Sequence, residues 1–308
     1  MRELKNGVKI IGVDTGYGQV KSANTVTKSA VTVYDSPPIF SGNTLEYNGK
    51  YYRFGEGHKT FITDKTEDED FYILTLMAIA RELGRVGIYA ADVHLAEGLP
   101  LTWVRAQRDS FKEYLMKNKS VDFKYNSKDF HINFVGCSVY PQAYPAIIER
   151  IGEFKGSNLL VDIGNGTINL LYINDKKPVE NKGWTEKLGV NQCVIRIKNA
   201  MMNNYGIKID ESIIDSFLKY GTVDILDEYL QCMRSITEQY VKDVFEALAT
   251  YEYNPNMTRL WLIGGGGCVV KHFGNYNKDR VTIIEDVCAT AKGLEYLAYA
   301  WLKRGVTV

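Results

Sequence analysis

One short pattern occurs twice in the chain, once in each half. The first copy runs from Val13 to Lys21 and the second from Val161 to Asn169, and each reads as a strand, then Asp-x-Gly-x-Gly, then another strand. Chance produces one such pattern in roughly a tenth of chains of this length, and two in about 1% or fewer. Two unrelated turns remain the alternative, because Asp and Gly are common in turns. The repeat favours two related units, each with a glycine hairpin at the end of a strand.

Paired glycine hairpins of this kind predict a phosphate site. Glycine permits positive φ and close backbone approach, so successive N–H groups can surround an anion. We expect one hairpin from each lobe to hold the phosphates, with Asp14 and Asp162 holding the waters of Mg²⁺ and Lys21 neutralising phosphate charge. The predicted binding residues are Asp14, Thr15, Gly16, Tyr17, Gly18, Gln19 and Lys21 in the first hairpin, and Asp162, Gly164, Asn165, Gly166 and Thr167 in the second.

A third glycine cluster follows a further apolar strand. Residues 260–263 lead into Gly264, Gly265, Gly266 and Gly267. Bare backbone would let a flat base and its ribose lie against it, so we expect Gly264, Gly265 and Gly266 to contact a nucleoside. Alone, the cluster is more typical of a flexible turn, and the nucleoside interpretation depends on the two hairpins. The sequence has no G-x-x-x-x-G-K-[ST] and no G-x-G-x-x-G after a strand.

Apolar patterns of strand and helix alternate along the chain, which indicates the α/β class. Asn48-Gly49, the preferred two-residue turn, predicts a hairpin over 45–54. A second hairpin is predicted over 121–135, around a turn at 126–129. Further strands are predicted at 8–13, 19–21, 92–101, 158–163, 167–173 and 259–263, helices at 71–85, 144–152, 225–251 and 287–302, and a linker at 152–156.

Composition excludes several classes of protein. The chain has 308 residues, 45% hydrophobic and 24% charged, which is typical of a globular protein, and its length favours two lobes. Lys and Arg number 37, as do Asp and Glu, so the net charge is zero and no overall basic footprint for nucleic acid exists. No apolar run is long enough to cross a membrane, and the first residues lack the apolar segment of a signal peptide.

Cysteine and histidine usage gives no sign of disulfides or of a zinc site. The five cysteines are scattered without a C-x-x-C, which favours reduced thiols and a cytoplasmic protein. The four histidines lie far apart in the sequence, so they lack the spacing of metal ligands.

Five motifs in order resemble the actin-like ATPase superfamily, which includes actin, sugar kinases and heat-shock chaperone ATPases. Asp14 to Lys21 resembles its first phosphate motif, and Asp162 to Asn169 its second. Ile263 to Gly267 resembles the adenosine motif. Val139 to Ala143 lies where the first connecting segment is expected, and Ala289 to Gly293 resembles the second. The match spans nearly the whole chain.

Within the superfamily, the chain is most similar to the ParM-type plasmid-segregation actins and their archaeal relatives. Asn48-Gly49-Lys50, Gly55-Glu56-Gly57 and Glu97 to Leu101 resemble that group's first lobe. The ParM proteins carry Glu in the first connecting segment, whereas this chain has Gln142, as actin does. The resemblance implies that Gln142 orients the attacking water without acting as a full base. Gln142, Asp162 and Asp14 are then the catalytic residues.

The resemblance also implies a fold and a function. The fold is a two-lobed one, with duplicated mixed-sheet domains flanked by helices around a nucleotide cleft. Domain I would comprise residues 1–157 and 289–308, and domain II residues 158–288. Such a protein binds ATP or GTP with Mg²⁺, polymerises and hydrolyses the nucleotide slowly, for example to segregate plasmid DNA. Its partners would be copies of itself and a DNA-bound adaptor, with no membrane and no direct nucleic-acid contact.

Three other functions belong to the same superfamily. A sugar or acyl kinase needs a carboxylate to accept the proton of the acceptor hydroxyl, and Gln142 cannot do this. Glu149 lies in the helix predicted over 144–152, where a solvated carboxylate is the simpler interpretation. A chaperone ATPase would carry a peptide-binding domain after the ATPase, and we expect none because the sequence ends at Val308. A regulator that only senses nucleotide remains an alternative.

Overall fold

The computed structural model describes residues 1–39, 42–55 and 64–305. The chain divides into two compact units. Unit 1 consists of Met1–Glu149 and Cys288–Val308, and unit 2 of Arg150–Val287. The chain passes from unit 1 to unit 2 between Glu149 and Arg150, inside the 3₁₀ helix η2 (Tyr144–Glu153). The boundary expected from the sequence was after residue 157.

Unit 1 is built on a ten-stranded mixed sheet with the order β4-β3-β2-β8-β10-β9-β6-β7-β5, and β1 also pairs with β2. Besides its part of η2, its described helices are α1 (Glu69–Gly84), α2 (Val104–Leu115), α7 (Ala289–Lys303) and the 3₁₀ helix η1 (Lys65–Glu67). Its strands are β1 (Arg2–Glu3), β2 (Lys9–Thr15), β3 (Gln19–Ser22), β4 (Val26–Lys28), β5 (Val31–Tyr34), β6 (Thr44–Tyr47), β7 (Lys50–Phe54), β8 (Ala90–Leu99), β9 (Ser120–Tyr125) and β10 (Lys128–Pro141).

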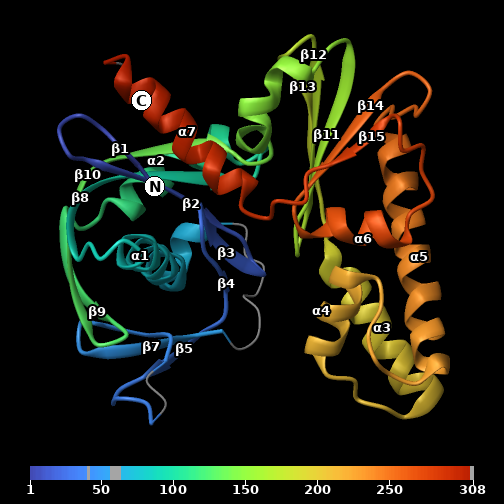
Figure 1. Ribbon diagram of the computed structural model, residues 1–308, viewed down its shortest axis with the longest axis horizontal. Helices are drawn as coiled ribbons and strands as arrows, with labels where there is room; N and C mark the ends of the chain where they lie inside the picture. The colour runs from blue at the N-terminus through green and yellow to red at the C-terminus, as the bar shows by residue number, and fades with distance from the viewer. Residues whose placement is uncertain (40–41, 56–63, 306–308) are drawn as a thin grey trace. The chain divides into compact units, whose positions relative to one another are not determined.

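Helix α1 forms the centre of unit 1. Twelve of its 16 residues are buried, so its apolar surface extends round the whole helix. A helix of this kind must be covered on every side. The sheet meets this requirement by curving round α1, with β2 and β3 on one side and β9 and β7 on others (Figure 1).

Helix α7 covers the opposite face of the sheet and packs there through its backbone. A Cβ atom added to Gly12 of β2 would overlap the carbonyl oxygen of Ala291, and one added to Gly293 would overlap that of Pro145 in η2. Only glycine fits at either position. These contacts bring the backbone of α7 directly against β2 and against η2.

We expect Gly293→Ala to destabilise unit 1 by about 2 kcal/mol or more, because the new methyl group has no space. Gly84→Ala is the matched control in α1, where the added Cβ would lie 3.7 Å from the Phe130 ring. Alanine is also the better helix former there, by about 1 kcal/mol. Thermal unfolding should show a lower Tm for Gly293→Ala alone, and equal Tm values for the two variants would contradict the packing described.

A buried histidine lies within the same sheet. His94 of β8 has its Nε2 2.8 Å from Ser138 Oγ, and Gly136 leaves room for the ring because a Cβ there would lie 2.6 Å from Nδ1. Burial, assisted by the charge of Lys112, lowers the pKa of His94 to about 4.

This histidine should make unit 1 sensitive to mild acid. An unfolded histidine has a pKa of about 6.5, so between about pH 6.5 and 4 the unfolded chain takes up a proton that the folded chain does not. The free energy of unfolding therefore has its full value above pH 6.5 and decreases as the pH falls through this window. The decrease is about 2 kcal/mol at pH 5. Urea unfolding at pH 7 and pH 5 should show this loss in the parent and a smaller one in His94→Gln. An identical loss in both would contradict the assignment.

Unit 2 contains a five-stranded sheet with the order β13-β12-β11-β14-β15. Helices α3 and α5 pack against each other, and α6 contacts β11, β14 and β15. The strands are β11 (Ser157–Ile163), β12 (Ile168–Asn174), β13 (Lys177–Glu186), β14 (Arg259–Ile263) and β15 (Val281–Ile283), and the described helices are α3 (Val190–Tyr205), α4 (Glu211–Tyr220), α5 (Asp227–Thr250) and α6 (Gly265–Phe273).

The two sheets share one topology. In unit 1 the antiparallel strands β4, β3 and β2 are followed by β8 and β10, which run parallel to β2. In unit 2 the antiparallel strands β13, β12 and β11 are followed by β14 and β15, which run parallel to β11. The prediction of an α/β fold with duplicated mixed sheets flanked by helices is confirmed.

Local differences from the predicted elements have simple causes. Strand β10 already begins at Lys128, because Asn126 and Ser127 adopt positive φ (48° and 62°) and complete the turn in two residues. The Asn48-Gly49 turn has the predicted form, with φ of 50° and 74°. The helix predicted over 144–152 is a 3₁₀ helix.

Glu56 and Gly57, which contributed to the family resemblance, lie outside the described residues. Among the helices that are described, none combines the length and apolar character needed to cross a membrane.

Candidate functional site

The first glycine hairpin connects β2 to β3 in unit 1. Asp14 pairs with Lys21 across the two strands, so their side chains lie on one face of the hairpin. The N–H of Gly16 lies 3.1 Å from both the Asp14 and Gln19 carbonyl oxygens. A Cβ at Gly16 would lie 2.8 Å from the Gln19 oxygen, so this tight turn requires glycine.

Ser29 holds the carbonyl groups of this hairpin from behind. Its hydroxyl donates to the Gly16 oxygen (2.6 Å) and its N–H donates to the Gly18 oxygen (3.1 Å). In a planar trans peptide the N–H points opposite to the C=O. The N–H of Tyr17 therefore points away from Ser29.

The N-terminus of α3 holds the second hairpin in the same manner. The N–H groups of Val190 and Asn191 donate to the carbonyl oxygens of Gly164 (3.0 Å) and Asn165 (2.9 Å). A weaker contact of 3.4 Å joins the Gly189 N–H to the Gly166 oxygen. The first turn of α3 is thus occupied by hairpin carbonyls and is not itself available to an anion.

Because the carbonyl groups of Gly164, Asn165 and Gly166 all point toward α3, the three N–H groups that follow them point the opposite way. By the same planar geometry, the N–H groups of Asn165, Gly166 and Thr167 point away from α3. Within the part of the chain that the structure describes, no backbone acceptor takes any of the three. A row of such donors is an anion-binding nest, so the second hairpin has the form expected of a phosphate cradle.

The segment before α3 is itself fixed. A Cβ on Gly189 would overlap the Asn165 oxygen, so glycine is required where α3 meets the hairpin. One residue earlier, the Leu188 oxygen accepts a 2.9 Å hydrogen bond from the hydroxyl of Tyr240, a buried residue of α5. The core of unit 2 thus supports the position of the hairpin.

The third glycine cluster forms a helix start beside the second hairpin. Gly264 has φ of +81°, and a Cβ there would lie 2.5 Å from Asp162 Oδ1, while one on Gly266 would overlap the Ile163 side chain. At Gly265 nothing lies within 4 Å of an added Cβ. Of the three glycines predicted to contact a nucleoside, Gly264 and Gly266 face β11, and Gly265 alone opens onto free space.

The end of β10 brings Gln142 to Asp14. Gln142 Nε2 donates to Asp14 Oδ1 over 2.8 Å, and its backbone N–H donates to the Leu99 oxygen over 2.7 Å. The amide nitrogen is thus committed to Asp14, which leaves the amide oxygen to accept a hydrogen bond. A glutamate at this position could bond to Asp14 only by holding a proton between two carboxylates.

Two charged residues of this region were not predicted as part of the site. Lys65 and Glu97 are both fully buried, and both bond to Thr15: Lys65 Nζ lies 2.6 Å from the Thr15 oxygen, and Thr15 Oγ1 lies 3.2 Å from Glu97 Oε2. Burial raises the pKa of Glu97 to about 8 although the charge of Lys65 opposes it, and burial lowers the pKa of Lys65. The sequence could have indicated Glu97, because a carboxylate inside the apolar strand β8 is unusual. It could not have indicated Lys65, because the charged neighbours of this lysine are typical of an exposed segment.

The remaining residues of the first hairpin differ in exposure. Tyr17 is buried, with its ring 5.7 Å from that of Phe71 in an edge-on contact, so it can meet a ligand only through its backbone. Gln19 is exposed and Lys21 is partly exposed.

The metal assignment to Asp14 and Asp162 stays a prediction. The residues described contain no group of three or more His, Cys, Asp or Glu side chains that could hold a metal ion directly. Asp14 is the second-last residue of β2 in unit 1 and Asp162 is the second-last residue of β11 in unit 2, so each occupies the same place in its own sheet. A carboxylate at such a place fits contact with Mg²⁺ through water.

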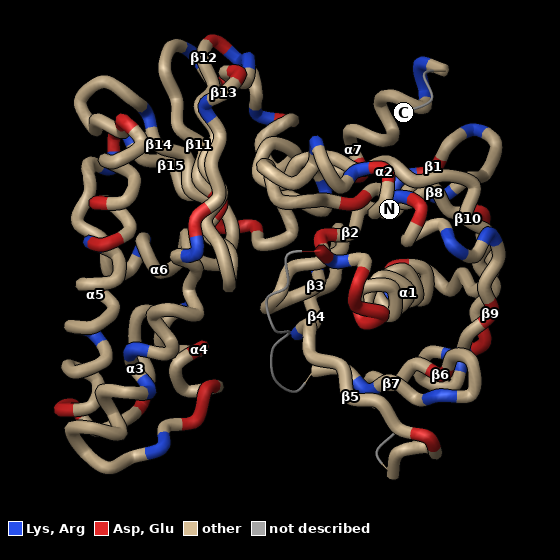
Figure 2. Tube along the Cα trace, turned by 180° about the vertical axis from the view of Figure 1, so that it is seen from behind, with Lys and Arg blue, Asp and Glu red and all other residues tan. Residues whose placement is uncertain are grey.

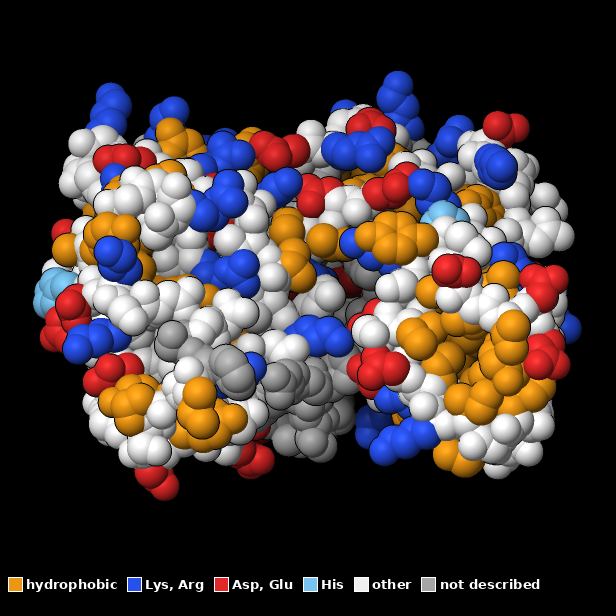
Figure 3. Space-filling view, turned by 60° about the horizontal axis from the view of Figure 1, so that its bottom comes forward, with side chains coloured by type: hydrophobic (Ala, Val, Ile, Leu, Met, Phe, Trp, Pro, Cys, Tyr) orange, Lys and Arg blue, Asp and Glu red, His pale blue; other side chains and the backbone are white. Residues whose placement is uncertain are grey.

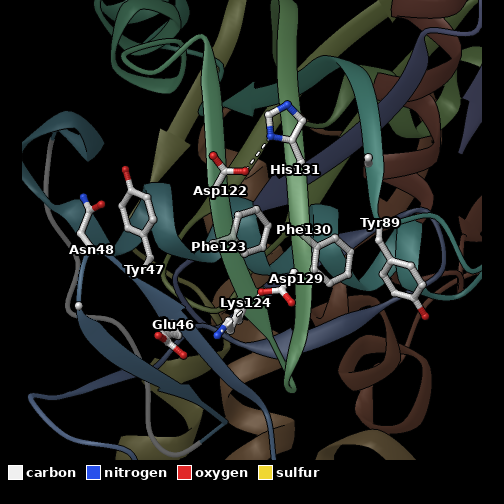
Figure 4. Close-up of a pocket in the computed structure, with 12 residues that line it drawn as sticks. Glu46, Tyr47, Asn48, Tyr89, Asp122, Phe123, Lys124, Asp129, Phe130 and His131 are labelled. Atoms are coloured by element: carbon white, nitrogen blue, oxygen red, sulfur yellow. Dashed lines mark hydrogen bonds and ion pairs between the residues drawn. The ribbon is translucent and has the colours of Figure 1, made fainter.

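A pocket of about 440 Å³ lies elsewhere, on the outer face of the sheet of unit 1 (Figure 4). The turn between β6 and β7 and the strands β9 and β10 line it, and it contains none of the predicted site residues. Its polar side chains include Asp122, whose Oδ1 lies 2.7 Å from Nδ1 of the exposed His131. This is the ordinary solvent-facing side of an antiparallel sheet.

Comparison with known proteins identifies the fold. Residues 12–144 match the family of actin-like proteins in its N-terminal domain, a stretch that contains the first hairpin and Gln142. The chain has an actin-like fold. No curated protein matches its sequence.

Several solved structures share the actin-like fold over almost their whole length. The archaeal actin homologue Ta0583 in complex with ADP is 18% identical, with 94% of this chain and 99% of that chain covered and a TM-score of 0.76. The apo psk41 ParM protein is 18% identical, with 96% and 98% covered and a TM-score of 0.70. The Alp12 filament structure is 17% identical, with 95% and 98% covered and a TM-score of 0.68.

The glycine cluster of this actin-like chain can be tested without a ligand. Gly266→Ala should lower the thermal stability of unit 2, because its Cβ would overlap the Ile163 side chain. Gly265→Ala should leave it unchanged or raise it by up to about 1 kcal/mol, since alanine favours the helix and meets open space. Thermal melts of both variants decide the matter, and a loss of stability in Gly265→Ala would contradict the geometry.

Proposed function

We propose that this actin-like chain binds and hydrolyses a nucleoside triphosphate, ATP or GTP with Mg²⁺, and polymerises into filaments that hydrolysis makes dynamic. The outward row of N–H groups at Asn165, Gly166 and Thr167 carries the proposal. Three aligned donors suit a phosphate group, whose oxygens accept several hydrogen bonds at once.

The other residues have roles that follow from their surroundings. Lys21 and Asp14 share one face of the first hairpin, where the lysine balances phosphate charge and the carboxylate contacts Mg²⁺ through water. Asp162 has the equivalent place at the second hairpin. Gly265 leaves space for the base or ribose. When bound, Mg²⁺ would neutralise charge on the phosphates.

Gln142 is suited to position a water molecule and not to remove its proton. Asp14 fixes the amide nitrogen, so the amide oxygen is the group that can accept a hydrogen bond from water. A side-chain amide is too weak a base to take up a proton near neutral pH. Hydrolysis without a strong base is expected to be slow. Slow hydrolysis suits a filament, because subunits can then add before their nucleotide is hydrolysed.

The same observation argues against a small-molecule kinase. Such an enzyme needs a base for the acceptor hydroxyl, and the other carboxylate considered for that role is Glu149. Its side chain is 56% exposed and pairs with Arg2 over 3.2 Å, which is the behaviour of a solvated residue. A role for Glu149 in proton transfer therefore has no support.

Assembly is proposed from the similar structures and from the surface. The Alp12 structure is of a filament and the Ta0583 structure holds ADP. Unit 2 exposes apolar side chains on its helices and their connections, and Figure 3 shows such side chains gathered on this part of the unit. Exposed apolar patches mark contact surfaces, here for other copies of this chain. The residues include Met202, Tyr205, Tyr220 and Leu226.

Plasmid segregation in the cytoplasm is the proposed setting. The net charge is zero, and Figure 2 shows Lys and Arg interspersed with Asp and Glu along both units. Binding to the DNA backbone depends on clustered positive charge. We therefore propose that a DNA-bound adaptor protein, and not the DNA itself, is the partner of the filament.

Gln142→Ala is the variant that tests the whole proposal. Loss of one positioned group should slow phosphate release about 100-fold, while nucleotide binding and assembly persist because the hairpins are unchanged. Light scattering and phosphate release should be followed together after adding Mg²⁺ with ATP or GTP. The parent should assemble and then disassemble, and the variant should remain assembled much longer.

Glu149→Ala is the matched control and should follow the parent. Disassembly of Gln142→Ala on the schedule of the parent would remove Gln142 from the mechanism. If the parent gives no scattering with either nucleotide, the filament proposal is wrong. Phosphate transfer that requires an added small-molecule acceptor would identify a kinase instead.

A further inference from the structure

Lys65 is an unusual residue to find inside unit 1. It is 1% exposed, and its ammonium group donates to the Thr15 carbonyl oxygen (2.6 Å) and to Thr15 Oγ1 (3.2 Å). A buried ammonium is costly unless its hydrogens are bonded and its charge is compensated. Thr15 supplies two acceptors, and the nearby carboxyl groups of Glu97 and Asp14 favour the charged ammonium.

Aromatic rings enclose the charge. The rings of Tyr17, Phe71 and Phe111 have their centroids 6.0, 5.3 and 5.7 Å from Nζ, within the range of cation–π attraction. Tyr17 belongs to the first hairpin, and the other two rings belong to α1 and α2. The ammonium is therefore held at one place against the end of β2.

That place is where the sheet lacks a donor. Gly16 bonds to Gln19 of β3, and because successive residues of a strand point to alternate sides, the C=O of Thr15 points away from β3 toward β8. The pairing of β2 with β8 ends at Val13. Continuing this register would set residue 100 against the Thr15 oxygen, and Pro100 has no N–H to donate. The ammonium of Lys65 donates to that oxygen instead.

The hydrogen bond from Lys65 to the Thr15 oxygen sets the orientation of the peptide group between Thr15 and Gly16. The Thr15 carbonyl and the Gly16 N–H belong to one planar group, so fixing the oxygen fixes the direction of the N–H. Ser29 holds the Gly16 and Gly18 carbonyls further along. Lys65 and Ser29 together determine how the hairpin presents its backbone.

We propose that Lys65 is a positioning residue for the first hairpin, whose ammonium replaces the missing strand donor at Thr15 and so holds the hairpin in the conformation that binds phosphate. The last clause rests on the proposed function; the positioning itself does not. Lys65 acts through Thr15 and touches no ligand.

The competing role is charge compensation for Glu97. Glu97 also accepts from Thr75 Oγ1 (3.1 Å) and the Gly98 N–H (3.3 Å), so it has neutral donors besides Thr15. Burial raises the pKa of Glu97 to about 8, and the charge of Lys65 opposes that rise. Removal of the Lys65 charge raises the pKa of Glu97 further and favours the neutral carboxyl, so we expect Lys65→Met to leave an uncharged group there.

The test is hydrogen exchange of the ligand-free protein, read by mass spectrometry on peptides covering residues 12–22. Lys65→Met should speed exchange there by about 10-fold or more, as expected for loss of a hydrogen bond from a charged donor. Peptides covering residues 161–169 should not change. Lys50→Met, at an exposed lysine of β7 in the same unit, is the matched control and should behave as the parent.

The double variant Lys65→Met/Glu97→Gln separates the two roles, and it replaces the single variant in the test if Lys65→Met does not fold. If peptides 12–22 still exchange fast in the double variant, the result supports Lys65 as a positioning residue for the first hairpin. Exchange that returns to the rate of the parent overturns it, since Lys65 would then only balance Glu97. Unchanged exchange in Lys65→Met also overturns it.

Calorimetry with Mg²⁺-ADP adds the functional readout. The Kd of Lys65→Met should rise about 10-fold, in proportion to the loosened hairpin. If the parent itself binds no Mg²⁺-ADP, the proposed function fails, and the exchange experiment still decides the role of Lys65. Tight binding by Lys65→Met together with fast exchange would overturn the link between the hairpin conformation and the ligand.

Discussion

The carbonyl groups of the glycine hairpins are bonded to residues behind them, and the direction of the site's peptide groups follows from this. In unit 2 the first turn of α3 supplies the donors. In unit 1 the donors are Ser29 and Lys65. Since a peptide is planar, holding its oxygen from one side presents its N–H on the other. The arrangement is prepared by folding, so a ligand need not order the loops when it binds.

Close backbone packing supports the arrangement in each unit. At Gly12 and Gly293 of unit 1, and at Gly189 and Gly266 of unit 2, glycine is present because another element occupies the space of a side chain. Gly12 and Gly293 let α7 approach β2 and η2 closely, and Gly189 and Gly266 let α3 and α6 approach the second hairpin and the end of β11. Their role is structural, in contrast to Gly265, which faces open space.

The duplicated strands and both hairpins could be predicted from sequence, because Asp-x-Gly-x-Gly after an apolar strand is a local signal. The start of α6 at Gly265 could not, since glycine disfavours helices and the helix forms through its packing on β11 and β14. Lys65 was missed because its burial depends on aromatic rings from three other elements, which only the folded chain brings together. The pairing of Gln142 with Asp14 joins positions 128 residues apart and needs the sheet to bring them together.

The row of donors in the second hairpin is made from atoms that every residue except proline possesses. Asn165 could be exchanged for another residue without removing its N–H, and Tyr17 already directs its side chain into the core. The information that specifies such a site is therefore stored in a few glycines and in the residues behind the loops, and not in the residues that a ligand would touch. Two chains can differ at most positions and still present the same backbone N–H groups to a ligand. Sequence identity is therefore a poor guide to whether a site of this kind is present.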